Sequence, residues 1–290
     1  MNTDEPVPAW FAEALAQRPD AHQVTVDGCE VAYRTWGPAG APVVVLVHGG
    51  AAHAGWWDHV APFLAIDRRV VALDLSGHGD SGWRDAYSLE TWAREVVAVA
   101  AAEGDAEPVV LGHSMGGFVA LTAAAQPGCR LRGAAAVDSP VRVLPDTVRE
   151  RAREAASAPR TKRYPDRESI LSRFRTLPDD DRDLPYVTRH VAEGSVRRVD
   201  DGWTWKFDQR IFGSSAMSPD MLGKAECPVA LVRAERGMAT PAIVADTAER
   251  LGGRVPVTTV LDSGHHVMLD QPVALVAVLQ TLTQMWSIHG

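Results

Sequence analysis

The chain has 290 residues, of which 46% are hydrophobic, and this suits one globular domain with an insertion. Its formal net charge of −8 argues against nucleic acid as a partner. No apolar run is long enough to span a bilayer, the acidic start lacks the features of a signal peptide, and the three cysteines stand far apart. We therefore expect a cytoplasmic protein that does not act at a membrane. The sequence leaves the oligomeric state open.

The first elements are predicted to be a helix and a hairpin. Apolar residues recur at helical spacing over residues 8–17, which indicates a short amphipathic helix. Two alternating runs, 23–26 and 30–36, flank the pair Asp27-Gly28. Asp-Gly between alternating runs is a strong signal for a β-hairpin.

The run 42–47 is almost entirely apolar, as expected of a strand covered on both faces. It ends in His48-Gly49-Gly50, and residues 54–65 after it have a helical pattern. A glycine-rich strand end of this kind can supply a backbone N–H to a neighbouring site, although it can also be a simple turn.

Residues 69–73 predict a further buried strand, followed by a loop of turn-forming residues over 74–82. Asp74 and His78 in this loop form a possible acid–base pair. We interpret both as structural, because such loops are held by local side-chain hydrogen bonds. Ser88 then predicts the N-cap of a helix that runs to Glu103.

The centre of the chain combines a strand, a tight turn and a helix around Ser114. The β-branched run 108–111 leads into Gly112-His113-Ser114-Met115-Gly116, and the helix-forming run 118–126 follows. This context is the one that a G-x-S-x-G nucleophile elbow requires, and it predicts a strained serine backbone. A chance match in a Gly-Ser loop is the alternative. The N–H groups of Met115 and Gly50 are candidate donors to an oxyanion.

A predicted strand over 132–137 ends at Asp138, and the pattern changes after Pro140. Charge is dense and strand signals are weak over residues 141–215, and residues 149–163 predict a helix. We interpret 141–215 as an inserted, mainly helical cap. Its aromatic residues, among them Trp205 and Phe212, form either the core of the cap or the wall of an apolar substrate pocket.

Strands and helices alternate again over residues 216–290, with strands at 228–233 and 255–261 and helices at 241–251 and 272–286. This rhythm predicts an α/β fold with a mostly parallel sheet and helices on both faces. Residues 1–140 and 216–290 would form the two parts of its core. The active site of such a sheet lies beyond the carboxyl ends of the strands.

A serine hydroxyl is a poor nucleophile at neutral pH and needs a base within hydrogen-bonding reach. His265 lies in a glycine-preceded loop after the last strand, so it is the first candidate. His266 is the alternative. The other histidines do not have the spacing of a metal site, because His48, His53 and His59 lie on different local structures.

Together these segments resemble the α/β-hydrolase superfamily, over the whole chain apart from the cap. The resemblance lies in His48-Gly49-Gly50, residues 74–81, the elbow around Ser114 and Gly264-His265. It implies a serine esterase-like enzyme with Ser114 as nucleophile, His265 as general base, and backbone donors at Gly50 and Met115. It implies no cofactor. We expect substrate contacts from five residues: His48, Gly49, Trp205, Phe212 and His266.

The triad acid departs from the pattern of the family. Members usually carry it after the strand that ends here at Arg233, and Gly237 stands where the aspartate is expected. A subset of the superfamily places the acid one strand earlier, and this position is Asp138. We favour Asp138, with Glu235 as the second candidate. Asp138 also has a structural interpretation, as the N-cap of the first cap helix.

The sequence thus predicts a hydrolase that cleaves an ester or similar acyl bond of a small, largely apolar substrate through an acyl-enzyme. Hydrolysis of carbon–carbon bonds in ring-cleavage products is one alternative, because that subgroup shares the serine elbow. A ligand-binding receptor on the same fold is the other, since a fold does not fix a function.

Overall fold

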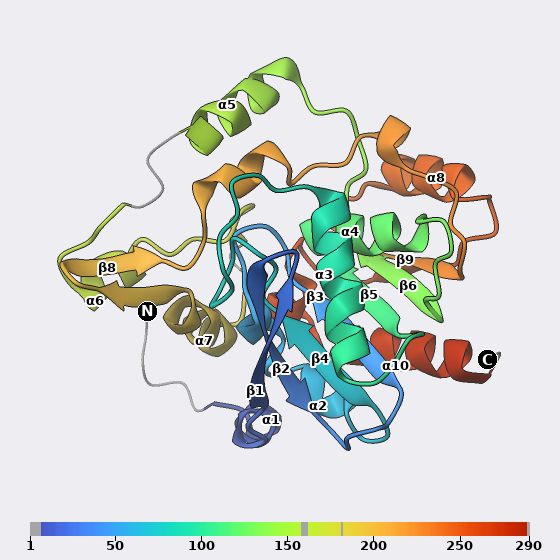
Figure 1. The fold of residues 1–290 in the computed structure, drawn as a ribbon, viewed down its shortest axis with the longest axis horizontal. Coiled ribbons are helices and arrows are strands. Elements are labelled where there is room, and N and C mark those ends of the chain that lie inside the picture. Colours follow the sequence, from blue (N-terminus) through green and yellow to red (C-terminus); the bar gives the residue numbers. More distant parts are fainter. Residues whose placement is uncertain (1–6, 158–161, 181, 289–290) are drawn as a thin grey trace.

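The computed structural model describes residues 7–157, 162–180 and 182–288. At its centre is an eight-stranded sheet in the order β1-β2-β4-β3-β5-β6-β9-β10 (Figure 1). Within this sheet only the pairs β1–β2 and β2–β4 are antiparallel, so the predicted mostly parallel sheet is confirmed. The strands are β1 (Asp20–Val26), β2 (Cys29–Trp36), β3 (Val43–Val47), β4 (Arg69–Leu73), β5 (Val109–His113), β6 (Gly133–Val137), β9 (Val229–Ala234) and β10 (Val257–Val260).

The predicted hairpin is formed by β1 and β2, with Val26 paired to Cys29. Asp27 and Gly28 have φ angles of 46° and 74°. Positive φ at both central residues is what a two-residue type I′ turn needs, and this explains the Asp-Gly pair.

Helices cover both faces of the sheet, as the sequence predicted (Figure 1). Alternate residues of β3 belong to different cores: Val43, Val45 and Val47 lie in one hydrophobic cluster, and Val44 and Leu46 in the other. The first cluster includes residues of α3 (Leu89–Ala102), α4 (Met115–Ala124) and α8 (Pro241–Arg250). The second includes residues of α1 (Ala9–Ala16), α2 (Ala61–Leu64), α9 (Val267–Asp270) and α10 (Pro272–Ile288). No described helix is long and apolar enough to cross a membrane.

One predicted helix differs in the structure, and the cap of another is confirmed. The run 54–65 is divided into a 3₁₀-helix, η1 (Ala54–Trp57), and α2. His53 caps η1 by accepting a hydrogen bond from the Gly55 N–H, and Pro62 has no N–H with which to continue a helix from the preceding turn. The Ser88 cap is confirmed, because its Oγ accepts from the Thr91 N–H over 3.1 Å.

The segment between β6 and β9 contains α5 (Asp146–Ser157), α6 (Arg167–Leu171) and α7 (Pro185–Gly194). The predicted end of the helix over 149–163 includes residues 158–161, which lie outside the described residues. The segment also contains an antiparallel pair, β7 (Val196–Val199) and β8 (Gly202–Trp205), which the weak strand signals did not reveal. Two short 3₁₀-helices follow, η2 (Gln209–Gly213) and η3 (Pro219–Met221). The cap boundaries at 141 and 215 remain a prediction.

Burial of histidines makes the stability of this fold sensitive to acid. Burial disfavours the imidazolium form and lowers the pKa of several side chains from the usual 6.5. The pKa falls to about 4 for His48, His53 and His59, to about 3 for His266, and well below 6.5 for His78 and His113. In the unfolded chain these groups regain their usual pKa. Between pH 6.5 and 4 the unfolded state therefore binds more protons than the folded state.

We expect the free energy of unfolding to fall as the pH is lowered through this window, by about 1.4 kcal/mol per pH unit for each net proton taken up. Burial raises the pKa of Asp183 to about 7 and of Asp270 to about 6, so at these two residues the folded state binds more protons than the unfolded state. This opposes the loss of stability in acid, but the buried histidines outnumber these two carboxyl groups. Urea unfolding at a series of pH values measures the slope. His59→Gln should reduce it, because glutamine keeps a donor for the Met268 carbonyl but does not titrate. A flat profile would contradict the expectation.

Candidate active site

Ser114 lies in the tight turn between β5 and α4, with φ 53° and ψ −118°. A positive φ is strained for a residue with a side chain. The turn is held by a hydrogen bond from the Ser114 N–H to the Val137 carbonyl of β6, over 2.9 Å. The predicted strain of this serine is confirmed.

The glycines on either side of the serine are sterically required. A Cβ at Gly112 would lie 2.0 Å from the Gly116 carbonyl oxygen, and one at Gly116 would lie 2.4 Å from the Val47 carbonyl oxygen. Strand, turn and helix therefore approach so closely that no larger residue fits at either position.

Three side chains from separate loops form a continuous hydrogen-bonded chain. The His265 Nε2 lies 3.0 Å from the Ser114 Oγ, and the His265 Nδ1 lies 2.7 Å from the Asp138 Oδ2. Because a carboxylate only accepts, the proton is on Nδ1, and Nε2 is left to accept from the serine hydroxyl. Asp138 is fully buried and His265 is 3% exposed, so water does not compete for the bond between these two residues. The arrangement suits proton transfer from the serine to His265.

The Asp138 carboxylate is fixed by the last residue of β9 and by the loop that follows this strand. It accepts from the N–H groups of Met238 (2.7 Å), Ala234 (3.1 Å) and Ala239 (3.3 Å). Its contacts are therefore with His265 and the β9 loop, and the interpretation as the N-cap of a cap helix is wrong.

Gly237 explains why the acid is not at its usual position. A Cβ at Gly237 would lie 2.3 Å from both oxygens of the Asp138 carboxylate. The carboxylate from β6 thus fills the space in which a side chain at 237 would begin. Glu235, the second candidate, is exposed, and its Oε2 accepts from the Asp262 N–H over 2.7 Å. The structure brings Asp138 to His265 and leaves Glu235 at the surface.

We expect Gly237→Ala to displace the Asp138 carboxylate, because the new methyl group would overlap it. Turnover should fall on the order of 10²-fold, and the free energy of unfolding by about 1–3 kcal/mol. Steady-state kinetics and urea unfolding measure the two effects. Gly213→Ala is the control, because a Cβ there makes an ordinary 3.5 Å contact with the Ala156 Cβ. Equal effects of the two variants would contradict the steric argument.

Gly50 and Met115 lie beside the serine, and all three line one cavity. Met115 is the first residue of α4, so its N–H has no carbonyl partner within the helix. A Cβ on Gly50 would lie 3.8 Å from the Met115 Sδ, which places the two segments next to each other. The positive end of α4 also points to this spot. Their role as oxyanion donors remains a prediction.

The cavity at Ser114 has a volume of about 470 Å³. The predicted contact residues Trp205, Phe212 and His266 line it. Residues that the sequence analysis did not single out for the site include Trp56, Phe174, Phe207 and Met238. Most of these aromatics follow β6 in the inserted segment. Only a structure could assign these aromatic residues to the cavity wall, because their sequence pattern fits the core of a cap equally well.

His48 and Gly49 are not among the lining residues, so their predicted substrate contact does not agree with the structure. The His48 Nδ1 lies 2.7 Å from the Gly49 carbonyl oxygen, and Nε2 accepts from the Leu75 N–H over 3.1 Å. Both ring nitrogens are therefore occupied: Nδ1 within the loop after β3, and Nε2 in a bond that joins this loop to the one after β4. In the same region the Asp74 carboxylate accepts from the N–H groups of Ala54 and Asp80, as its structural interpretation requires.

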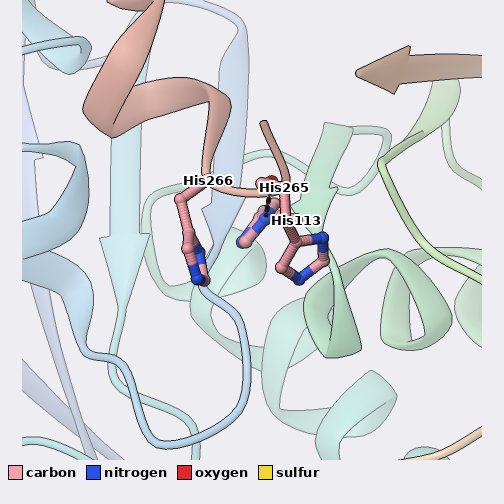
Figure 2. Close-up of side chains that lie close together, drawn as sticks. All are labelled: His113, His265 and His266. Carbon is pink, nitrogen blue, oxygen red and sulfur yellow. Dashed lines mark hydrogen bonds between the residues drawn. The ribbon is translucent and has the colours of Figure 1, made fainter. Parts of the chain in front are cut away.

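His113 has a position that the sequence analysis did not assign. Its Nε2 donates to the His265 carbonyl oxygen over 2.8 Å (Figure 2). This bond holds the loop that carries the candidate base. Burial lowers the His113 pKa well below 6.5, so the ring is neutral at pH 7. The only signal in the sequence was its place next to Ser114 in the elbow.

Figure 2 also shows the His266 ring close to those of His113 and His265. Nitrogens of the three rings lie within 4.8 Å of one another, and this is the candidate metal-ligand group that the described residues contain. Both His265 nitrogens, however, already face Asp138 and Ser114. Metal binding would compete with the serine–histidine–aspartate chain.

Comparison with known proteins identifies the family of the chain. Residues 44–278 match the model of the alpha/beta hydrolase family. Esterase Rv0045c of Mycobacterium tuberculosis is 30% identical over 256 residues, which are 84% of this chain and 83% of the relative. Lipase LipV of the same species is 27% identical over 252 residues, which cover 85% of this chain and 95% of the lipase.

Solved structures show the same fold. The crystal structure of esterase Rv0045c has a TM-score of 0.68 at 26% identity and covers 98% of this chain and 100% of its own. E-2-(acetamidomethylene)succinate hydrolase has a TM-score of 0.77 at 19% identity, with 92% and 99% covered, and this likeness concerns the fold alone. The chain belongs to the alpha/beta hydrolase family.

Proposed function

We propose that the protein is a serine-dependent esterase with Ser114 as nucleophile, His265 as general base and Asp138 as the acid that orients it. The hydrogen-bonded chain from the Ser114 Oγ through His265 to the Asp138 carboxylate is the observation that carries the proposal. The similarity to an esterase and a lipase over most of the chain favours an ester as the substrate.

In the first half of the reaction the Ser114 Oγ attacks the ester carbonyl, and its proton moves to the His265 Nε2. The Asp138 carboxylate stabilises the imidazolium that forms. The tetrahedral oxyanion faces the N–H groups of Gly50 and Met115. His265 then gives the proton to the departing alkoxide, which leaves as the alcohol.

In the second half the acyl group is bound to the Ser114 Oγ. A water molecule gives a proton to the His265 Nε2 as it attacks the acyl carbonyl, and the second tetrahedral intermediate faces the same two N–H groups. Its collapse returns the proton to Ser114 and releases the carboxylic acid.

We propose that residues 141–215 act as a cap that determines the substrate. Trp205 and Phe212 from this segment line the cavity together with Trp56 and Met238. An aromatic wall of this kind suits a small substrate that is largely apolar near the scissile bond.

Two assays on the purified protein test the proposal. Hydrolysis of p-nitrophenyl esters of increasing acyl length should show saturation and an optimum length set by the cavity. A fluorophosphonate should label Ser114, and peptide mapping identifies the labelled residue. A folded protein that hydrolyses no ester and takes up no label would contradict the proposal and favour a ligand-binding role.

A further inference from the structure

The cavity at Ser114 has a charged wall as well as an aromatic one. Arg173 and Arg175, just after α6, line it. None of the described residues that line it is an aspartate or a glutamate. In a chain with a formal net charge of −8, the described lining of this cavity carries arginines and no carboxylate.

Arg173 is held against an anchored aromatic ring. Its guanidinium lies 5.9 Å from the centre of the Tyr164 ring, and the Lys162 Nζ lies 5.5 Å from the same centre. Tyr164 is fixed to the β7–β8 hairpin, since its N–H donates to the Trp203 carbonyl over 2.9 Å and the Trp203 N–H donates back over 2.8 Å. The Tyr164 ring also packs edge-on against Trp205, which lines the cavity. Two cations thus lie against the ring of Tyr164, and of these two Arg173 lines the cavity together with Tyr164.

The Arg173 guanidinium forms no ion pair with a carboxylate of the described residues. The two arginines on either side of it in the sequence do have partners. Arg167 on α6 lies 3.7 Å from the Glu193 carboxylate, and Arg175, after α6, donates to the carbonyls of Ser172 and Phe174. A guanidinium that faces a cavity, and whose donors are not paired with a carboxylate of the described residues, can bind an anionic oxygen group with strong, charge-assisted hydrogen bonds.

We propose that the substrate carries an anionic oxygen group, a carboxylate or a phosphate, at a distance from the scissile bond, and that Arg173 binds it. The inference rests on the proposed esterase function. The aromatic wall, with Phe174 and Trp205, would pack on the chain between the ester and the anion. Two classes of substrate would carry such a group: half-esters of dicarboxylic acids carry a carboxylate, and acyl thioesters of a phosphate-bearing thiol carry a phosphate.

Matched pairs of neutral and anionic substrates test the proposal. Ethyl half-esters of succinate, glutarate, adipate and suberate are compared with their diethyl esters, using initial rates. Butyryl-coenzyme A is compared with the butyryl thioester of N-acetylcysteamine. The wild type should prefer the anionic member of one pair by about tenfold in kcat/KM, the scale of one charge-assisted hydrogen bond. The preferred pair identifies the source, and added salt should reduce the preference.

Arg173→Gln should remove about tenfold of kcat/KM for the anionic member, mainly through KM, and leave the neutral member within about twofold. Arg173→Lys should restore part of the loss. Arg167→Gln is the matched control, because it removes the same charge from the same segment but from a residue outside the cavity lining. An equal effect of Arg173→Gln on both members, or a wild-type preference for the neutral one, would overturn the proposal.

A binding measurement separates this inference from the esterase function. Monoethyl adipate and coenzyme A are titrated by calorimetry into Ser114→Ala and into the Ser114→Ala/Arg173→Gln double variant. Binding that is weakened about tenfold by the second substitution supports the anion site even if no ester is hydrolysed. If the two variants bind each ligand with equal affinity, the anion site is overturned, even where neutral esters are hydrolysed and the esterase function stands.

Discussion

Ser114→Ala is expected to lower kcat on the order of 10⁴- to 10⁶-fold, as for other serine triads. The substitution removes the Oγ that lies 3.0 Å from the His265 Nε2, and no acyl-enzyme can then form. Any residual rate would come from binding and from the proposed oxyanion donors at Gly50 and Met115. The measurement is steady-state hydrolysis of the best p-nitrophenyl ester, with active sites of the wild type counted by the fluorophosphonate.

The fold should tolerate this change, because alanine meets the positive φ at position 114 with a side chain no larger than that of serine. Thermal unfolding checks that the variant is native. Ser195→Ala is the matched control: Ser195 lines the same cavity, but its Oγ donates to the Val191 carbonyl over 2.7 Å. It should change kcat only a few-fold. A native Ser114→Ala protein that keeps a tenth of the wild-type rate would exclude the serine mechanism.

The elbow was predictable from the sequence because its constraints are local. Gly112, Ser114 and Gly116 lie within five residues, and the strand and helix on either side have unmistakable compositions. The steric requirement for each glycine involves backbone atoms of the turn and of the neighbouring β3. A short motif in its correct context therefore determines both the strain at the serine and the direction of α4.

The choice between the two acids needed the structure. Asp138 and Glu235 both follow buried strands, so periodicity does not distinguish them. The informative signal was Gly237, the glycine at the position where a side chain was expected. The reason for this glycine is visible only in the structure, where the Asp138 carboxylate, which follows β6, occupies the space beside Gly237 in the loop after β9.

The inserted segment was the least predictable part. Its hairpin, β7 with β8, consists of two four-residue strands with the sequences Val-Arg-Arg-Val and Gly-Trp-Thr-Trp, and each has too few residues to show a period. Tyr164 reaches Trp203 across almost forty residues of chain, a pairing that no local pattern encodes. For the same reason the sequence could not assign Arg173 to the cavity, nor show that His48 is turned away from it.

Asp138→Asn is expected to lower kcat on the order of 10⁴-fold. The carboxylate holds the His265 proton on Nδ1 and leaves Nε2 free to accept from the serine. An asparagine that turns its NH₂ group to Nδ1 favours the other tautomer, in which Nε2 carries the proton and cannot act as a base. The amide also offers a single acceptor oxygen to the three N–H groups, at the end of β9 and in the loop after it, that Asp138 now satisfies. Kinetics and urea unfolding should both be measured.

Glu235→Gln is the control, since glutamine keeps an oxygen that accepts from the Asp262 N–H. It should change kcat by less than about twofold, as is usual for an exposed site away from the chemistry. A large loss in Glu235→Gln together with a small loss in Asp138→Asn would move the acid to the surface glutamate.

A transfer of the acid between strands gives the sharpest test of why Gly237 is a glycine. Asp138→Gly empties the space that a side chain at position 237 would enter, because a Cβ on residue 237 would lie 2.3 Å from the oxygens of the Asp138 carboxylate. Adding Gly237→Asp should then return a carboxylate to the neighbourhood of the His265 Nδ1. We expect the double variant to be at least about tenfold more active than Asp138→Gly alone, the smallest gain consistent with one restored charge-assisted hydrogen bond. No recovery in a native double variant would mean that the β6 origin of the carboxylate, with its three backbone donors, is itself needed to orient His265.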